Sequence, residues 1–322
     1  MHNLSVVMYH YVRQIKNSRY PGIKGLELDS FIEQVKFLKR NYNVVTMEEV
    51  IASYDQDHSL PPNPVLLTFD DGYAEHFSHV YPVLKKYEMQ GSFYIPAKTV
   101  QENVLLDVNK IHFILASCKE PEQLIRRIEQ QINFYSKDYP LKHFDCYFKE
   151  LAIANRFDCA EVIFVKRILQ HGLPEELRNI ITDVLFVEFV GMDEAAFSKE
   201  LYMDKTQIQH MINDGMHVGS HGYDHYWWNK LDSNALDQEI SRSLKFLEQV
   251  GVNMKNWTAC YPYGSSSEKV VSVLNSKGCK LAFTTQVNTA DLTSENPLLI
   301  PRLDTNDLPK QHRAPTNKWY GN

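Results

Sequence analysis

Two aspartates stand side by side where a short, mostly apolar run ends. Asp70 and Asp71 follow residues 65–69 and precede Gly72. Asp-Gly is a common turn dipeptide, so a turn that ends a strand would explain this sequence. Each of two adjacent carboxylates must nevertheless be solvated, paired or bound to a metal ion. The pair is therefore a candidate for metal binding or proton transfer.

Two histidines follow a second strand-like run. His221 comes directly after residues 217–220, and His225 lies four positions further on. This spacing lets both imidazoles point to one side of a helical or turn-like backbone, although ordinary surface or core histidines often share it. Combined with the aspartate pair, they supply two imidazoles and one carboxylate for a divalent metal, and one carboxylate remains for proton transfer. Three ligands leave positions open for water and substrate, as catalytic metal sites do.

A rigid aromatic turn forms the third motif. Tyr261, Pro262, Tyr263 and Gly264 follow one another after a further strand-like run. A structural turn explains this sequence as well as a functional one does. In the functional interpretation, a backbone N–H of the turn binds a developing oxyanion while its rings line a cleft of sugar size.

Short β-branched or aromatic runs alternate with amphipathic helices over both ends of the chain. This order, with short connections, implies parallel strands and right-handed crossovers, hence a barrel or a doubly wound sheet. Catalytic residues of both folds lie at the carboxyl ends of the strands, where the three motifs fall. Two capping boxes, Ser30 to Glu33 and Thr46 to Glu49, predict helix starts. The expected strands cover residues 6–9, 44–45, 65–69, 92–95, 217–220, 257–261, 281–284 and 299–303.

The middle of the chain follows a different pattern. Only two of the 13 glycines fall between residues 101 and 205, and apolar residues recur there at helical spacing. We therefore expect an all-helical insertion over residues 105–205. Residues 1–104 and 206–308 would then form one α/β domain of roughly 210 residues, the size of a single barrel. Residues 309–322 are expected to be a loosely ordered polar tail.

Composition excludes several classes of protein. A net charge of -6 offers no basic excess for a phosphate backbone, which argues against a nucleic-acid partner. No apolar run reaches the roughly 20 residues of a membrane span. Five cysteines without a Cys-x-x-Cys pair indicate reduced thiols. The N-terminus lacks the features of a signal peptide, so the sequence predicts a cytoplasmic protein, and it indicates no oligomeric state.

The three motifs, in this order, resemble those of a known family. Residues 68–73, 221–225 and 261–264 resemble the first three motifs of the polysaccharide deacetylase family, the chitin deacetylase-like carbohydrate esterases that share the NodB homology domain. Residues 8–12 are similar to the opening of a subgroup of that family, and the resemblance covers roughly residues 4–100 and 206–304. It implies a deformed (β/α)7-8 barrel that removes an acyl group from an N-acylated sugar.

The resemblance also implies roles for individual residues. Asp71, His221 and His225 would hold one divalent metal, usually zinc in this family, with cobalt, nickel or manganese as alternatives. Asp70 would be the general base. The backbone N–H of Tyr263 would help to bind the oxyanion.

Two departures from the family pattern concern the base and the general acid. Cys260 stands where many members have the arginine that orients the base, and Arg302, at the end of the last expected strand, is the candidate replacement. The late Leu-x-His motif that supplies the general acid is not visible. His10, at the end of the first strand, is better placed for this role than His312, although a structural histidine explains His10 equally well.

The leading hypothesis is a metal-dependent hydrolase that removes an acetyl or formyl group from an amino sugar, in the synthesis of a surface polysaccharide or glycolipid. Its partner would be an N-acylated sugar, a glycan or a lipid-linked sugar. One alternative is a non-catalytic carbohydrate-binding barrel, suggested by Cys260 and the absent acid motif. Another is a hydrolase of a non-sugar amide or imide. The helical insertion could cap the cleft, bind a carrier or form an interface.

Overall fold

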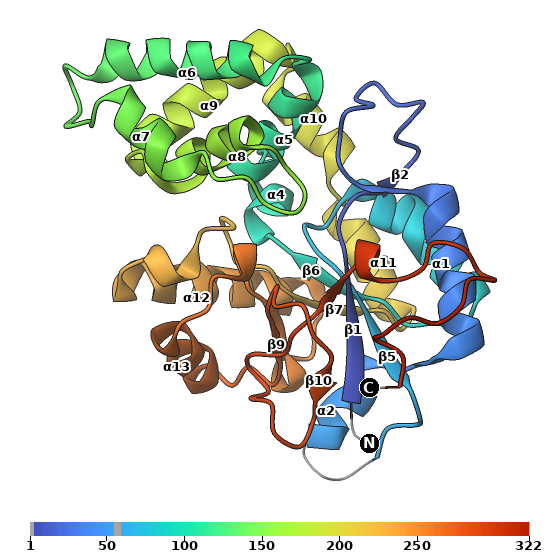
Figure 1. The fold of residues 1–322 in the computed structure, drawn as a ribbon. Helices are drawn as coiled ribbons and strands as arrows, with labels where there is room; N and C mark the ends of the chain where they lie inside the picture. Colours follow the sequence, from blue (N-terminus) through green and yellow to red (C-terminus); the bar gives the residue numbers. More distant parts are fainter. Residues whose placement is uncertain (1–2, 55–58, 322) are drawn as a thin grey trace. The chain divides into compact units, whose positions relative to one another are not determined.

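A computed structural model of the chain describes residues 3–54 and 59–321, which divide into two units (Figure 1). The first unit comprises Met1–Gln14, Gly25–Asn103 and Lys199–Asn322, and the second comprises Ile15–Lys24 and Val104–Ser198. The second unit is helical, like the insertion expected over residues 105–205, but it ends at Ser198 and also takes in Ile15–Lys24. The helical unit is therefore built from two separate stretches of sequence.

A nine-stranded sheet forms the centre of the first unit. Its order is β10-β1-β5-β6-β7-β8-β9, with β11 also paired to β1 and β4 to β5. All of these pairs are parallel except β1 with β10. The strands are β1 (Asn3–Tyr9), β4 (Asn43–Val44), β5 (Pro64–Phe69), β6 (Ser92–Ile95), β7 (His217–Ser220), β8 (Ala259–Cys260), β9 (Ala282–Phe283), β10 (Ala290–Asp291) and β11 (Leu303–Asp304); β2 (Val12–Arg13) and β3 (Leu26–Glu27) form a separate pair.

The sheet curls until its two sides are connected. A parallel bridge joins Phe283 of β9 to Ile300, and Leu303 of β11 pairs with Val7 of β1. The α/β class and the deformed barrel predicted from the sequence are therefore confirmed.

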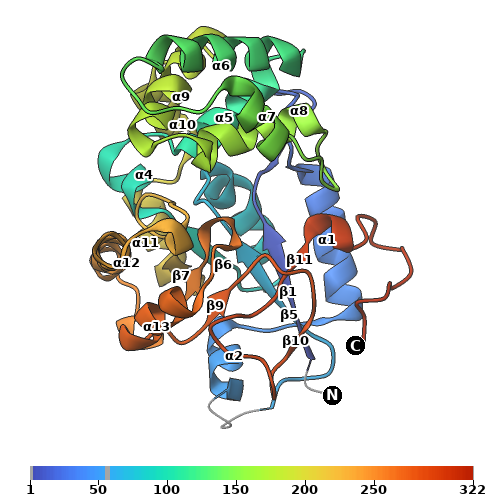
Figure 2. The ribbon, with the colours of Figure 1, turned by 60° about the vertical axis from the view of Figure 1, so that its left-hand side comes forward.

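Helices surround this sheet in the first unit and make up the second. Figure 2 shows α1 on one side of the sheet and α12 with α13 on the other. The first unit contains α1 (Leu28–Asn41), α2 (Met47–Tyr54), α3 (Tyr81–Lys86), α4 (Ala97–Glu102), α11 (Lys205–Asn213), α12 (Ser233–Val250) and α13 (Glu268–Ser276). The second contains α5 (Asp107–Ser117), α6 (Pro121–Tyr135), α7 (Phe144–Leu151), α8 (Ala160–Arg167), α9 (Glu175–Phe189) and most of α10 (Glu194–Leu201).

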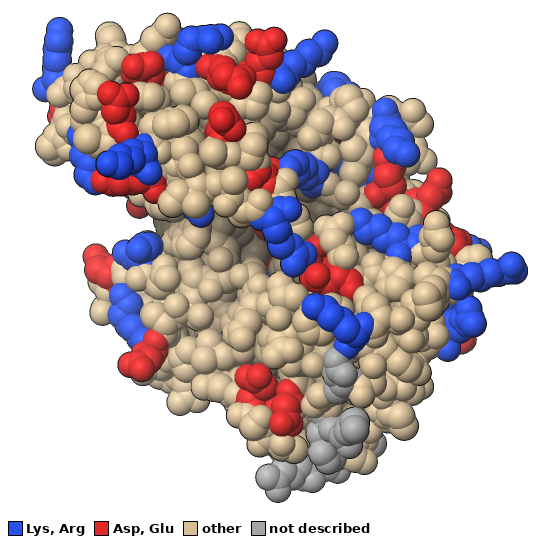
Figure 3. Space-filling view, viewed as in Figure 1, with Lys and Arg blue, Asp and Glu red and all other residues tan. Residues whose placement is uncertain are grey.

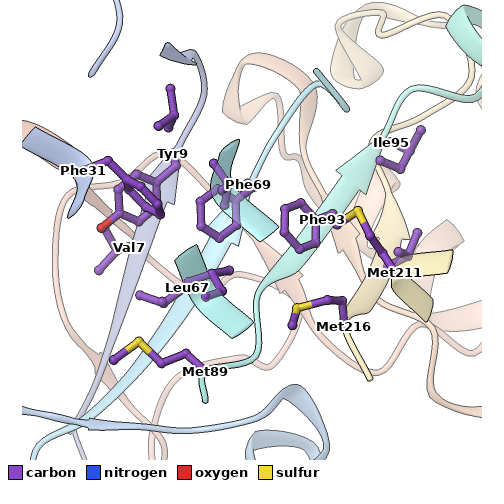
Figure 4. Packing of buried hydrophobic residues seen from close by; sticks show 14 of the residues in the cluster. Val7, Tyr9, Phe31, Leu67, Phe69, Met89, Phe93, Ile95, Met211 and Met216 are labelled. Carbon is purple, nitrogen blue, oxygen red and sulfur yellow. The ribbon is translucent and has the colours of Figure 1, made fainter. Parts of the chain in front are cut away.

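Aromatic packing holds the central strands in register. Figure 4 shows the rings of Tyr9, Phe69 and Phe93 in a row across β1, β5 and β6. Each neighbouring pair is stacked with ring centroids 4.9 Å apart. All residues of β5 are buried, as expected of a central parallel strand that is covered on both faces. This packing fixes the position of the aspartates that follow β5.

One local expectation, the start of α1, differs from the structure. The capping box at Thr46 and Glu49 forms, but α1 begins at Leu28, ahead of the box predicted at Ser30. Strand β3, which pairs with β2, ends at Glu27, and α1 follows it directly. In the predicted polar tail, Trp319 and Tyr320 pack against the hydrophobic core.

Among the described residues, no helix is both long and apolar enough to cross a bilayer. On the face shown in Figure 3, basic and acidic side chains are interspersed. That face has no basic stripe of the kind that follows a nucleic-acid backbone.

Candidate active site

The carboxyl ends of four parallel strands carry the side chains of the candidate site. His10 follows β1, Asp70 follows β5, His221 follows β7 and Tyr261 follows β8. Parallel strands of a barrel present these ends at one rim, so residues far apart in sequence meet there. The backbone N–H of Asp70 donates to the carbonyl of Tyr9, at 2.9 Å, which ties the first two strand ends together.

Arg302 reaches this rim from a different backbone position than predicted. The sequence placed it at the end of a strand over residues 299–303, whereas the structure places it just before β11. The reason is that its neighbours pair with different strands, Ile300 with β9 and Leu303 with β1. The Arg302 side chain still lies at the rim, where it meets Asp70.

Arg302 and Asp70 form a buried, two-pronged ion pair. Arg302 Nη1 donates to Asp70 Oδ1 at 3.0 Å, and Nη2 donates to Oδ2 at 2.8 Å. Arg302 Nε donates to the carbonyl of Thr284 at 2.8 Å, and the two charged side chains are 0% and 2% exposed. Such a fork fixes both the position and the plane of the carboxylate.

The surroundings of Asp70 keep it ionised. Burial raises the pKa of Asp70, but the charges of Arg302, His221 and His10 outweigh burial and lower this pKa to about 2. The thiol of Cys260 also contacts Asp70, with Sγ donating to Oδ2 at 3.6 Å. Burial raises the pKa of Cys260, so it meets the carboxylate as a neutral thiol.

Asp71, His221 and His225 form a compact group beside this pair. Their candidate ligand atoms all lie within 4.8 Å of one another, and all three residues are buried. Asp71 Oδ1 is 3.4 Å from His221 Nε2 and 3.5 Å from His225 Nε2. Asp71 and His225 have left-handed backbones, with φ of 74° and 59°. Non-glycine residues rarely adopt this conformation, and such strain concentrates at functional sites.

The chemistry of these donors fits a divalent cation. His221 Nδ1 lies 2.9 Å from the carbonyl of Cys260, so this nitrogen carries a proton, and Nε2 is the nitrogen that faces Asp71 and would bind a cation. Burial and the neighbouring His221 lower the pKa of His225 to about 3, which keeps that ring neutral. Asp71 Oδ1 has no hydrogen-bond partner among the described residues, although it is buried. An unpaired carboxylate oxygen that faces two imidazole nitrogens is suited to zinc or a similar ion.

His10 lies at the open side of the ion pair. Its Nε2 is 3.8 Å from Asp70 Oδ2, and its side chain is 42% exposed. The ring of His76 fixes its backbone, because His76 Nε2 donates to the His10 carbonyl at 2.9 Å. An imidazole in this position can meet a bound molecule from the solvent side.

Tyr263 lies beside the histidines in a strained turn. Its backbone is left-handed, with φ of 57°, and its ring meets the ring of His225 edge to face at 4.7 Å. On another side it stacks with Trp227 at 4.7 Å. Gly264 also has a positive φ, and a Cβ there would lie 2.1 Å from Thr285 Oγ1, so only glycine fits. The turn therefore holds Tyr263 rigidly next to the group of Asp71, His221 and His225.

A family model for Polysaccharide deacetylase matches residues 57–137 and 187–282, more than half of the chain. The chain belongs to the polysaccharide deacetylase family. The matched ranges contain both aspartates and both histidines, whereas His10 and Arg302 lie outside them. The family expected from the sequence motifs is thus confirmed.

Known proteins similar to this family member agree with the assignment. The "Putative polysaccharide deacetylase YxkH" of Bacillus subtilis (strain 168) is 33% identical over 98 residues, which cover 30% of this chain and 33% of YxkH. The match thus spans about a third of that relative. The Streptococcus pyogenes deacetylase PplD in complex with acetate has a similar fold, with a TM-score of 0.57, 14% identity and coverage of 95% of this chain and 96% of PplD. The BpsB deacetylase domain from Bordetella bronchiseptica gives a TM-score of 0.56, 14% identity, and coverage of 94% and 96%.

The sequence motifs did not reveal Glu239, which shapes the histidine loop of this family member. Its Oε1 accepts the backbone N–H groups of Tyr223 and Asp224 at 2.8 and 2.9 Å. Burial, and then the charge of Asp224, raises the pKa of Glu239 to about 7. The sequence did contain one signal for Glu239: it is a charged residue between Leu236 and Ile240, on the apolar face of α12.

Replacing Glu239 by glutamine should remove a pH dependence from stability. The folded-state pKa, about 7, exceeds the ordinary 4.5, so wild type loses stability as pH rises between these values. Between pH 5 and pH 8, the free energy of unfolding should fall further in wild type than in Glu239→Gln. We expect the two decreases to differ by about 2 to 3 kcal/mol. The amide oxygen can still accept both N–H groups. Urea denaturation at the two pH values measures this difference, and parallel changes in both proteins would contradict it.

Proposed function

We propose that this protein is a metal-dependent hydrolase that removes an N-acetyl or N-formyl group from an amino sugar. One observation carries the proposal: Asp70, fixed by the Arg302 fork, lies directly beside a buried group of one aspartate and two histidines. A proton acceptor next to a cation site is the arrangement that amide hydrolysis with water requires.

Asp71, His221 and His225 would hold the cation. Two imidazoles and a carboxylate suit zinc, with cobalt, nickel or manganese as alternatives. When bound, such an ion makes water more acidic and polarises the acyl carbonyl. The chain itself supplies neutral imidazole at His225 and an unpaired anionic oxygen at Asp71.

Asp70 would act as the general base. A carboxylate has about four lone-pair sites, of which Arg302 takes two and the Cys260 thiol one. At least one site thus remains to accept a proton from the attacking water. Because Arg302 holds the carboxylate rigidly, this lone pair keeps one direction.

His10 and Tyr263 would complete the reaction. The exposed His10 imidazole would protonate the leaving amine, and the backbone N–H of Tyr263 would donate to the oxyanion of the tetrahedral intermediate. The rings of Tyr263 and Trp227 offer apolar faces of the kind that sugars contact.

The Asp70–Arg302 pair favours catalysis over a non-catalytic carbohydrate-binding barrel. That alternative rested on Cys260, which lacks the charge of the usual arginine, and Arg302 provides this charge from the segment just before β11. A role in the synthesis of a surface polysaccharide or glycolipid, a cytoplasmic location and the part played by the helical unit stay predictions.

Acyl release from defined sugars tests the proposal. Purified protein would be stripped of metal, reloaded with Zn²⁺ or Co²⁺, and given N-acetyl and N-formyl amino sugars, free, as oligomers and lipid-linked. We expect acetate or formate release that stops with a chelator and returns with metal. Sugar binding without release would support the binding barrel, and release only from a non-sugar amide or imide would support the other hydrolase.

A further inference from the structure

One tyrosine contacts the side of Asp71 that faces away from the histidines. The Tyr73 hydroxyl donates to Asp71 Oδ2 at 2.5 Å, and Tyr73 is fully buried. The other oxygen, Oδ1, is the one that lies 3.4 and 3.5 Å from His221 and His225. The two oxygens of Asp71 therefore have different surroundings.

A second tyrosine orients the first. The rings of Tyr11 and Tyr73 stack with centroids 4.1 Å apart, and their hydroxyl groups are hydrogen-bonded. A carboxylate only accepts, so the single proton of Tyr73 points to Asp71. Tyr11 must then donate to the oxygen of Tyr73. The result is a relay in which each hydroxyl has one direction.

The ring of Tyr73 is confined on its remaining sides. Tyr202 forms an antiparallel bridge with Tyr73, and their rings stack at 6.2 Å. His76 meets the Tyr73 ring edge to face at 5.5 Å. The ring that carries the donor to Asp71 is thus fixed in place.

We propose that Tyr73, supported by Tyr11, is a positioning residue that reserves one oxygen of Asp71 for the cation. This inference rests on the proposed function, because it needs a cation at Asp71. By occupying Oδ2, Tyr73 prevents the carboxylate from rotating and from offering both oxygens at once. Partners of this kind typically change metal affinity 10- to 100-fold when they are removed.

Cobalt binding to three tyrosine variants tests the inference without using activity. In Tyr73→Phe, Oδ2 loses its donor, so we expect Co²⁺ affinity to fall roughly 10- to 100-fold and the Co²⁺ absorption spectrum to change. Tyr9→Phe is the matched control, because Tyr9 is equally buried and its hydroxyl has no hydrogen-bond partner in the described part of the chain. Its affinity should stay within about twofold. Calorimetric titration gives the affinities, and thermal unfolding without metal shows that each variant is folded.

The outcomes separate this inference from the proposed function. Wild-type affinity and an unchanged spectrum in Tyr73→Phe would overturn the positioning role while leaving the cation site intact. If wild type itself bound neither Co²⁺ nor Zn²⁺, both would fall. Should Tyr73→Phe not fold, Tyr11→Phe takes its place. It keeps the Tyr73 hydroxyl but removes the donor to it, so a smaller loss of affinity in the same direction is expected, and no loss would overturn the relay.

Discussion

Replacing Asp70 by asparagine is expected to slow acyl release on the order of 10³-fold while the cation stays bound. Asparagine has nearly the same shape, but its amide cannot take a proton from water. The ligands Asp71, His221 and His225 are unchanged, so Co²⁺ affinity should stay close to that of wild type. Initial rates of acetate or formate release, together with calorimetric titration of Co²⁺, measure the two quantities separately.

The same substitution leaves the buried Arg302 without its counter-charge, which would destabilise the protein for a reason unrelated to proton transfer. The double variant Asp70→Asn with Arg302→Gln removes both charges and serves as the control. Both variants should be inactive if Asp70 is the base. An Asp70→Asn protein that is folded, holds Co²⁺ and releases acyl groups at the wild-type rate would show that the base lies elsewhere.

Replacing Arg302 by methionine is expected to lower the free energy of unfolding by about 3 to 5 kcal/mol. The Asp70 carboxylate would remain buried without a cationic partner, and the Thr284 carbonyl would lose its donor. A suitable control is Lys85→Met, which breaks the exposed pair of Lys85 with Asp214 and should cost less than about 1 kcal/mol. Chemical denaturation at pH 7 compares them. Equal stability of the two variants would contradict the importance of the buried pair.

Arg302→Met should also move the pH profile of the reaction. In wild type, the pKa of Asp70 lies at about 2, below its ordinary 3.8, so the stability that the pair provides is present above pH 3.8 and is lost as pH falls toward 2. Without Arg302, burial raises this pKa unopposed by the guanidinium. The base is then protonated at higher pH, and the acid limb of kcat/KM should shift upward. Arg302→Lys keeps the charge but not the fork, so its shift should be smaller.

The aspartates and histidines could be predicted because each group follows a buried strand directly. In a parallel barrel, the carboxyl ends of such strands converge at one rim. The four-residue spacing of the two histidines can be read directly from the sequence. The position of Arg302 could not be predicted in the same way. Strands β9 and β11 contain only two residues each, and their limits depend on which distant strand they meet. Arg302 itself was identified only because Cys260 stands where many family members have the arginine that orients the base.

Residues that act through another side chain were harder to find. Tyr73 is part of the first motif, but nothing in the sequence indicates that its hydroxyl turns back to Asp71 rather than into solvent. Glu239 lies far from every motif, and only its place on an apolar helix face marks it.

The short segment Ile15–Lys24 limits how the helical unit can be exchanged between relatives. Lys24 binds Asp158 and the carbonyl of Phe157, and Gly22 lies so close to Ala116 that a Cβ would be 2.9 Å from its carbonyl oxygen. The polypeptide therefore enters and leaves this unit twice. Removing only Val104–Ser198 would leave Ile15–Lys24 without the residues that it contacts. A functional chimaera therefore needs two coordinated replacements.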